Sequence, residues 1–241
     1  MSGSAEDRLH ERPENEGKTK SGLLRFTREL GAHGFLLPYG LTYDDTARLL
    51  YGISRKFEDD DLYDQARKSN PDITKTELLV SVAKTVYTEL FEWNHGRLFV
   101  ILRDRLLEKT ENDSAKYEKI RQVLFAFEHG LYYPCACGLV SMIEGELGKA
   151  SHSSSTKLYE LIRLLKEQER QGEDEIIFEN VCGYISQLAR SANFVHDEEP
   201  DSINRHWLLH GRNERKIDRF DCLSLLNLYE EILVLIENKV Q

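Results

Sequence analysis

Apolar side chains recur at α-helical spacing through most of this chain, and this periodicity is what most constrains its fold. In the longest such segment, residues 74–109, they return at intervals of three and four. Hydrophobic residues make up 40% of the 241 positions, with only 15 Gly and 5 Pro among the rest. We find no strand-like alternation of apolar and polar residues. The sequence therefore predicts an all-α multi-helix bundle.

Composition divides the chain into three parts. Residues 1–22 are rich in Ser, Gly, Glu, Asn and Lys, and we expect a disordered polar tail because so few apolar groups are present to bury. Residues 23–112 are predicted to form an N-terminal helical region, and residues 113–241 a C-terminal helical domain. The boundary between the two lies at Glu111-Asn112-Asp113, after which the helical pattern restarts.

Local signals predict where helices begin and break. Asn94-His95-Gly96 predicts a kink in the long helical segment. Pro134 suits the first turn of a helix. A short helix should follow Pro200, with Asp201 or Ser202 as its N-cap. Further helices are expected at residues 114–129, 156–170, 175–192 and 218–240.

The last predicted helix carries a broad apolar surface, made of two adjoining stripes along residues 218–240. Such a surface either faces several partner helices or contributes to a dimer interface. Asp221, in the first turn, favours the positive end of the helix dipole.

The overall charge limits the classes of function. A net charge of −10 argues against broad adhesion to nucleic acid but permits a local basic site. No apolar run approaches the roughly 20 residues that span a membrane, and the polar N-terminus lacks the apolar segment of a secretory signal. The four cysteines fit reduced thiols. We therefore expect a cytoplasmic protein without membrane contact.

One short segment concentrates chemically active side chains. Residues 204–212 carry two imidazoles, two guanidiniums and an amide. An imidazole can move a proton at a ribose hydroxyl, and a guanidinium can stabilise charge on phosphoryl oxygens. Arg205 and His210 are therefore the candidate catalytic pair. They lie about 140° apart on a regular helix, so they can address one phosphate only through the reach of Arg205, an irregular helix end or a second copy of the motif.

Three further residues are candidate supporting groups. Glu144 lies among apolar neighbours and is expected either to be partly buried against a cation such as Arg205 or to lie on an exposed edge. Asn204 can bind phosphate or, as is more frequent at such a position, cap the helix. His206 precedes His210 by four residues, a spacing that can bind zinc. The spacing indicates no third ligand, so we expect neither a metal nor another cofactor.

A basic run follows this segment and supplies the candidate RNA-binding residues, which are Arg212, Arg215, Lys216 and Arg219. A purely structural reading also remains open, in which Arg205 forms a salt bridge near a helix start and His210 packs before Gly211.

The run Arg205-His206-Trp207-Leu208-Leu209-His210 resembles the signature of the HEPN family of helical domains, which is Arg, a polar residue, three more residues and His. The similarity extends over residues 114–241, including the long apolar helix after the motif. It implies a metal-independent endoribonuclease whose active site forms across a homodimer from Arg205 and His210 of both subunits. It also implies a role in toxin–antitoxin or antiviral defence, with a protein antitoxin or regulator as partner. Because the family includes inactive members, the alternative is a noncatalytic HEPN-like dimer that binds a protein or a nucleotide.

Overall fold

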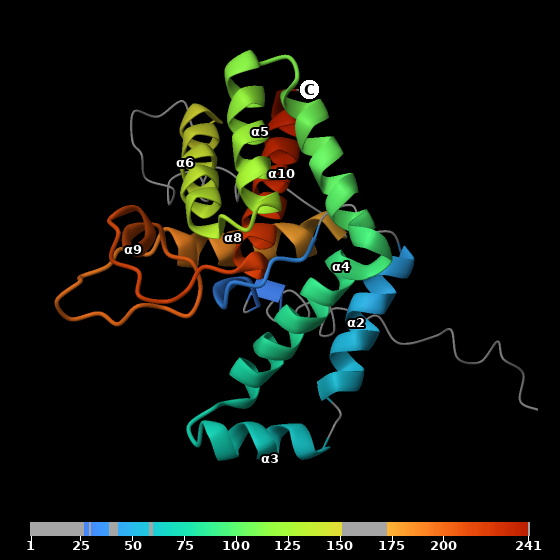
Figure 1. Cartoon of the computed structure of the whole chain (residues 1–241), viewed down its shortest axis with the longest axis vertical. Coiled ribbons are helices and arrows are strands. Elements are labelled where there is room, and N and C mark those ends of the chain that lie inside the picture. Colours follow the sequence, from blue (N-terminus) through green and yellow to red (C-terminus); the bar gives the residue numbers. More distant parts are fainter. Residues whose placement is uncertain (1–26, 29, 39–42, 58–59, 151–172, 241) are drawn as a thin grey trace, which may run out of the picture.

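The chain folds into a set of packed helices (Figure 1). The computed structural model describes residues 27–28, 30–38, 43–57, 60–150 and 173–240. Of the described residues, 75% are helical and none lies in a strand, so the predicted all-α fold is confirmed. None of the described helices is long and apolar enough to cross a membrane. The predicted tail at residues 1–22 and the predicted helix at residues 156–170 lie outside the described residues.

The helix boundaries follow the local signals of the sequence in most places. In chain order the helices are α2 (Tyr43–Phe57), α3 (Asp60–Ser69), α4 (Lys75–Thr110), α5 (Ser114–Glu128), α6 (Tyr132–Ala150), α8 (Glu173–Leu188), α9 (Arg205–Leu209) and α10 (Arg219–Val240).

The long helix α4 shows how local chemistry sets these boundaries. Thr74 caps its start, and the Glu77 side chain accepts the Thr74 backbone N–H at 2.7 Å in return. The backbone of residues 93–96 leaves the helical conformation, with positive φ at Asn94-His95-Gly96. Glycine adopts positive φ without strain and asparagine more readily than most residues. The predicted kink is therefore confirmed.

The starts of α5 and α10 are also fixed by acidic side chains. The Asp113 side chain accepts the backbone N–H of Lys116 at 3.0 Å. At α10, Asp218 and Asp221 accept each other's backbone N–H, both at 3.0 Å. Asp218 is thus the cap of α10 rather than its first residue, because its side chain satisfies an amide that has no partner inside the helix.

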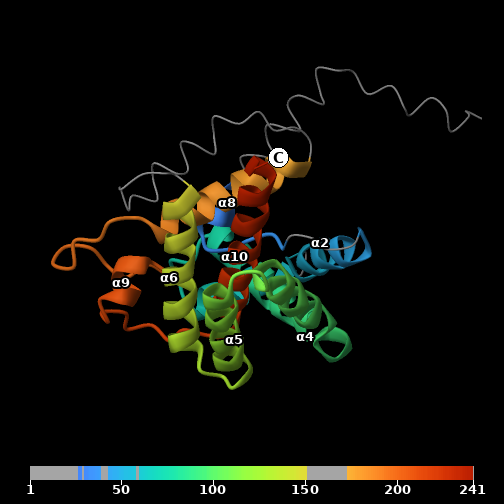
Figure 2. The ribbon, with the colours of Figure 1, turned by 90° about the horizontal axis from the view of Figure 1, so that it is seen from above.

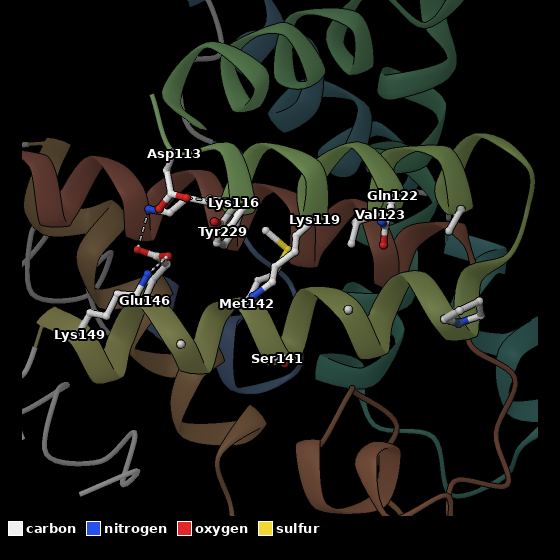
Figure 3. A pocket seen from close by; sticks show the side chains of 15 residues that line it. Asp113, Lys116, Lys119, Gln122, Val123, Ser141, Met142, Glu146, Lys149 and Tyr229 are labelled. Atoms are coloured by element: carbon white, nitrogen blue, oxygen red, sulfur yellow. Dashed lines mark hydrogen bonds and ion pairs between the residues drawn. The ribbon is translucent and has the colours of Figure 1, made fainter. Parts of the chain in front are cut away.

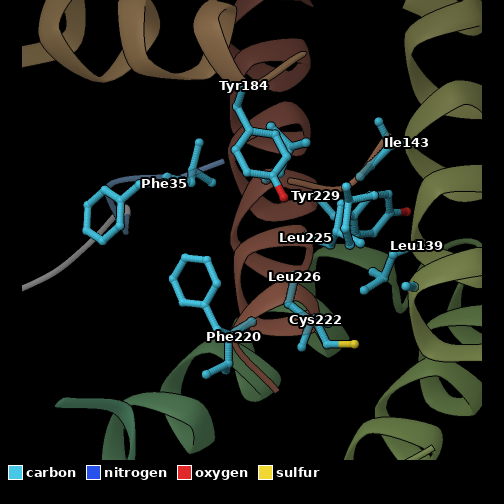
Figure 4. Close-up of a cluster of buried hydrophobic side chains, with 14 of the residues drawn as sticks. Phe35, Leu139, Ile143, Tyr184, Phe220, Cys222, Leu225, Leu226 and Tyr229 are labelled. Carbon is cyan, nitrogen blue, oxygen red and sulfur yellow. The ribbon is translucent and has the colours of Figure 1, made fainter. Parts of the chain in front are cut away.

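The last helix, α10, forms the centre of the core. It packs against α4 and α6, and α8 crosses it (Figures 1 and 2). Every residue from Phe220 to Leu233 is buried. Figure 4 shows side chains of α10 meeting Tyr184, Leu139 and Ile143 from α8 and α6. The broad apolar surface of this helix therefore faces several partner helices within one chain, the first of the two explanations that the sequence left open.

A segment before α2 is locked against α8 by one buried amide. The Asn180 side chain donates to the carbonyls of Thr27 and Phe35 at 2.8 and 3.0 Å, and accepts the Leu37 N–H at 2.6 Å. A Cβ at Gly31 would lie only 2.2 Å from the Asn180 carbonyl oxygen, so only glycine permits this approach. The N-terminal helical region and the C-terminal helices consequently share one hydrophobic core.

The cysteines behave as packing residues. All four are free thiols, and Cys135, Cys182 and Cys222 are buried. The Cys222 thiol donates to the Tyr132 carbonyl at 3.3 Å. Contact with Cys135 and burial raise the pKa of Cys222, which keeps it protonated.

Candidate functional site

The site is built on α9, a helix of one turn that packs against α6 at the edge of the molecule (Figures 1 and 2). Asn204 caps it, accepting the backbone N–H groups of His206 and Trp207 at 2.9 and 3.4 Å. The same carboxamide donates to the carbonyls of Gln187 and Arg190 at 3.2 and 2.8 Å. The capping role predicted for Asn204 is therefore confirmed, whereas Asp201 and Ser202, also predicted as caps of a short helix after Pro200, do not cap α9. The hydrogen bonds of Asn204 go to backbone groups, which leaves the amide no part in binding phosphate.

The first catalytic candidate is held by a carboxylate from another helix. Arg205 begins α9, and its Nη1 forms an ion pair with Glu144 of α6. Both side chains are partly buried, at 23% and 29% exposure, which strengthens a charge-assisted hydrogen bond. Glu144 therefore has the cationic partner that its apolar neighbours required. The pair fixes one end of the guanidinium and leaves its Nε–H directed toward His206.

The two imidazoles of the motif lie beside this guanidinium. The Arg205 Nε–H donates to His206 Nε2 at 3.4 Å, and the rings of His206 and His210 stack with their centroids 6.0 Å apart. His210 is the C-cap residue and is exposed. The irregular helix end that the sequence analysis allowed is thus present. His206 lies between Arg205 and His210, which the spacing alone did not predict.

The electrostatics of the site favour a neutral His206. Burial, followed by the positive charge of Arg205 and the nearby His210, lowers the pKa of His206, while Glu144 opposes the shift. A neutral ring can accept the hydrogen bond from Arg205, whereas a protonated ring would repel it. This hydrogen bond is therefore stable at neutral pH and lost in acid.

An aromatic and cationic cluster adjoins the imidazoles. Phe194, from the loop before α9, makes edge contacts with Trp207 and His210 at centroid distances of 5.1 and 5.7 Å. The Arg212 guanidinium lies over the Phe194 ring, 4.7 Å from its centroid. Phe194 is not among the site residues predicted from the sequence. Its only signal was a lone aromatic side chain within a polar loop.

The four candidate RNA-binding cations have different environments. Arg215 makes a two-point ion pair with Asp221 at 2.9 and 3.0 Å. Arg219 lies 3.5 Å from Glu92. Arg212 and Lys216 are exposed. The structure therefore separates two cations that serve the fold from two that face solvent.

Acidic side chains border the other flank of α9. A cavity of about 470 Å³ lies there, with Asp197, Glu198, Glu199 and Asp201 in its wall. The Glu199 carboxylate accepts the backbone N–H groups of Glu214 and Arg215 at 2.6 and 3.0 Å, which anchors the following loop. These carboxylates make the potential on this side of α9 unfavourable for an anion.

In the described part of the chain, no three His, Cys, Asp or Glu residues are grouped closely enough to hold a metal ion. What the site offers is a guanidinium, two imidazoles and an adjoining aromatic surface, which together suit proton transfer beside a bound phosphate.

Comparison with known proteins adds nothing to this geometry, since no family model, curated protein or solved structure matches the chain.

Proposed function

We propose that this protein is a metal-independent endoribonuclease of the HEPN type. The observation that carries the proposal is the grouping of Arg205, His206 and His210 around one turn of helix, with Arg205 anchored by Glu144. The resemblance of this motif to the HEPN signature supplies the reaction class. Glu144 is a positioning residue in this proposal, because it acts through Arg205.

In the proposed reaction, His210 removes the proton from a ribose 2′-hydroxyl. The 2′ oxygen then attacks the adjacent phosphorus, and the bond from phosphorus to the 5′ oxygen breaks. Arg205 stabilises the negative charge that builds on the phosphoryl oxygens. The partner subunit's His210 returns a proton to the leaving 5′ oxygen. The products are a 2′,3′-cyclic phosphate and a 5′-hydroxyl, and no metal is needed.

The neutral form of His206 supports this arrangement. While neutral, it accepts the Arg205 Nε–H and keeps the guanidinium at the motif. Because burial and the charge of Arg205 lower the pKa of His206, this neutral state prevails at neutral pH. Cleavage should therefore fall at acidic pH in the wild type.

The neighbouring surface supports binding of single-stranded RNA. Phe194 and Trp207 present aromatic rings for base stacking, and Arg212 and Lys216 offer cations to the backbone. Arg215 and Arg219 have no such role in the proposal, because both already pair with carboxylates.

A homodimer would complete the site. Tyr133 and Leu209 are exposed apolar side chains, and the Tyr133 hydroxyl donates to the Leu208 carbonyl at 3.1 Å, so they adjoin at the edge of α9. A second copy covering this patch would bring two motifs together. Leu209→Glu should give a monomer by light scattering and abolish cleavage. Tyr51→Glu, a change at an exposed apolar position on α2, should do neither.

The decisive experiment incubates the purified protein with a mixture of RNAs in the presence of EDTA. RNA should be cut, DNA of the same sequence should remain intact, and mass spectrometry should find 2′,3′-cyclic phosphate ends. His210→Ala should lower the rate by about 10²–10⁴-fold. Glu144→Gln should lower it less, because Arg205 keeps its charge but loses its anchor.

His33→Ala is the matched control, because His33 is exposed and lies outside the motif. It should cut RNA at the wild-type rate. A folded His210→Ala protein that retains full activity, or cleavage that EDTA abolishes, would contradict the proposed chemistry.

The second candidate is a noncatalytic HEPN-like dimer that binds a protein or a nucleotide. The internal pairing of Arg205 with Glu144 and the acidic flank of α9 favour it, because both reduce the net positive charge offered to RNA. RNA that binds without being cut, at a salt-sensitive affinity reduced by Arg212→Glu, would support this candidate over the nuclease.

The resemblance also implies the biological setting, a toxin–antitoxin or antiviral defence system with a protein antitoxin or regulator. Expression in a bacterial host tests this part. The wild-type chain should arrest growth and His210→Ala should not.

A further inference from the structure

A second site lies away from α9, in a groove between α5 and α6 (Figure 3). The groove encloses a cavity of about 480 Å³, within the range of about 300–1,000 Å³ for small-molecule sites. The two helices run antiparallel, and α10 provides the floor. Its lining runs along α5 from Asp113 to Ala126, about 20 Å at the rise of an α-helix. The groove is therefore elongated along the two helices.

One end of the groove is polar and carries an excess of lysines. The buried Glu146 carboxylate lies 3.0 Å from the Lys116 ammonium and 3.5 Å from that of Lys149. Its negative charge is thus already balanced. Lys119 also lines the groove, where Figure 3 draws it between the helices, and it makes no ion pair with any described residue. This end consequently favours an anion.

The floor at this end holds a hydroxyl that lacks a partner. Tyr229 of α10 is fully buried and lines the groove, and among the described residues nothing accepts or donates a hydrogen bond at its hydroxyl. Burial, then the carboxylates of Glu146 and Asp113, raise the pKa of Tyr229, so the hydroxyl stays protonated. A buried hydrogen-bond donor without an acceptor is rare in native proteins and requires an explanation. A ligand oxygen at this place would provide one.

The rest of the groove is mostly apolar, with Gln122 and Ser141 as its polar lining residues. Val123, Ala126 and Met142 line it, together with Gly138 and Gly145 of α6. A Cβ added at Gly145 would meet no atom within 4 Å, so the space beside this glycine is open. An apolar chain laid along the groove can therefore approach the α6 backbone closely.

We propose that this groove binds a linear anionic amphiphile, a medium-chain fatty acid. Its carboxylate would accept the Tyr229 hydroxyl and lie beside Lys119, and its acyl chain would run along Val123 and Met142. The occupant follows from the shape and the charge together. A free anion leaves the apolar part empty, whereas an uncharged alkyl chain leaves the buried Tyr229 hydroxyl without a partner and makes no ion pair with Lys119. The proposal is independent of the nuclease function, because it involves none of the residues of α9.

Calorimetric titration of the full chain with sodium decanoate, below its micelle concentration, tests this inference. Decanoate should bind at a single site, while acetate and decanol, which carry only the head or only the chain, should bind at least tenfold more weakly. Failure of decanoate to bind, or equal binding of decanol, would overturn the proposal.

Substitutions then locate the site. Tyr229→Phe should weaken decanoate binding by about tenfold or more, the effect of losing a hydrogen bond to a charged group. Without ligand its unfolding midpoint should be unchanged or higher, because the lost hydroxyl had no partner. Gly145→Leu should fill the groove and abolish binding.

Arg121→Gln is the control, since Arg121 lies on α5, pairs with Glu118 and does not line the groove. It should bind decanoate as the wild type does. Equal affinity in all of these variants would show nonspecific association with the surface and would reject the groove as the site.

Discussion

Substitution of Glu230 by Gln should stabilise the protein at alkaline pH, because this buried carboxylate is poorly compensated. Glu230 lies on α10 with only 1% of its side chain exposed, and its nearest cation is Arg105 at 3.6 Å. Neither carboxylate oxygen has a hydrogen-bond partner among the described residues. Burial raises the pKa of Glu230 from its ordinary 4.5 to about 7, and the charges of Arg105 and Lys109 offset only part of this rise.

The size and sign of the effect follow from this shift. A pKa raised from 4.5 to about 7 means that folding favours the protonated form of Glu230 over the ionised form by about 3 kcal/mol. Between these pH values the folded chain holds a proton that the unfolded chain has released. The free energy of unfolding therefore falls as pH rises through this window. The stability that Glu230 contributes through this proton is fully present below pH 4.5 and is lost as pH rises through about 7.

Glutamine has the shape of the protonated carboxyl and does not titrate. Glu230→Gln should therefore match the wild type near pH 4.5 and exceed its unfolding free energy by about 1–3 kcal/mol at pH 8. Urea denaturation followed by circular dichroism at both pH values measures the difference. Glu108→Gln, at an exposed position of α4, should change the unfolding free energy little at either pH. A Glu230→Gln protein no more stable than wild type at pH 8 would refute the reasoning.

Three further predictions concern the site. Arg212→Glu and Lys216→Glu should each weaken RNA binding and reduce the slope of log affinity against log salt by about 1, as filter binding at several salt concentrations would show. Asn204→Ala should lower the unfolding free energy by about 1–2 kcal/mol, because α9 loses its cap; thermal denaturation measures this, and an unchanged midpoint would exclude the capping role. Arg215→Met should lower the unfolding free energy by about 3 kcal/mol, because the Asp221 carboxylate stays buried without its cationic partner. The salt dependence of RNA binding should be the same as in the wild type.

Much of the fold could be predicted from the sequence because the decisive interactions span only three or four residues. Asp113 caps α5 through an amide three positions later, and Asn94-His95-Gly96 kinks α4 through backbone preferences of the residues themselves. The all-α class follows from the same local periodicity. A short helix was expected after Pro200, and the sequence offered Asp201, Ser202 and Asn204 as its cap. Asp201 and Asn204 have similar capping propensity, and only the hydrogen bonds of Asn204 to the end of α8 and the residue beyond it distinguish them.

The candidate site shows where local reasoning ends. The sequence determined which residues carry guanidinium and imidazole groups and that they lie within one short segment. The tertiary structure decided which partners these groups have. Packing of α9 on α6 pairs Arg205 with Glu144, 61 positions earlier, and Asp221 at the start of α10 pairs with Arg215. The same is true of the groove floored by Tyr229, which exists only where three helices meet. The charge partners of a side chain and the cavities beside it depend on which helix surfaces face each other, and local sequence patterns do not show which surfaces meet.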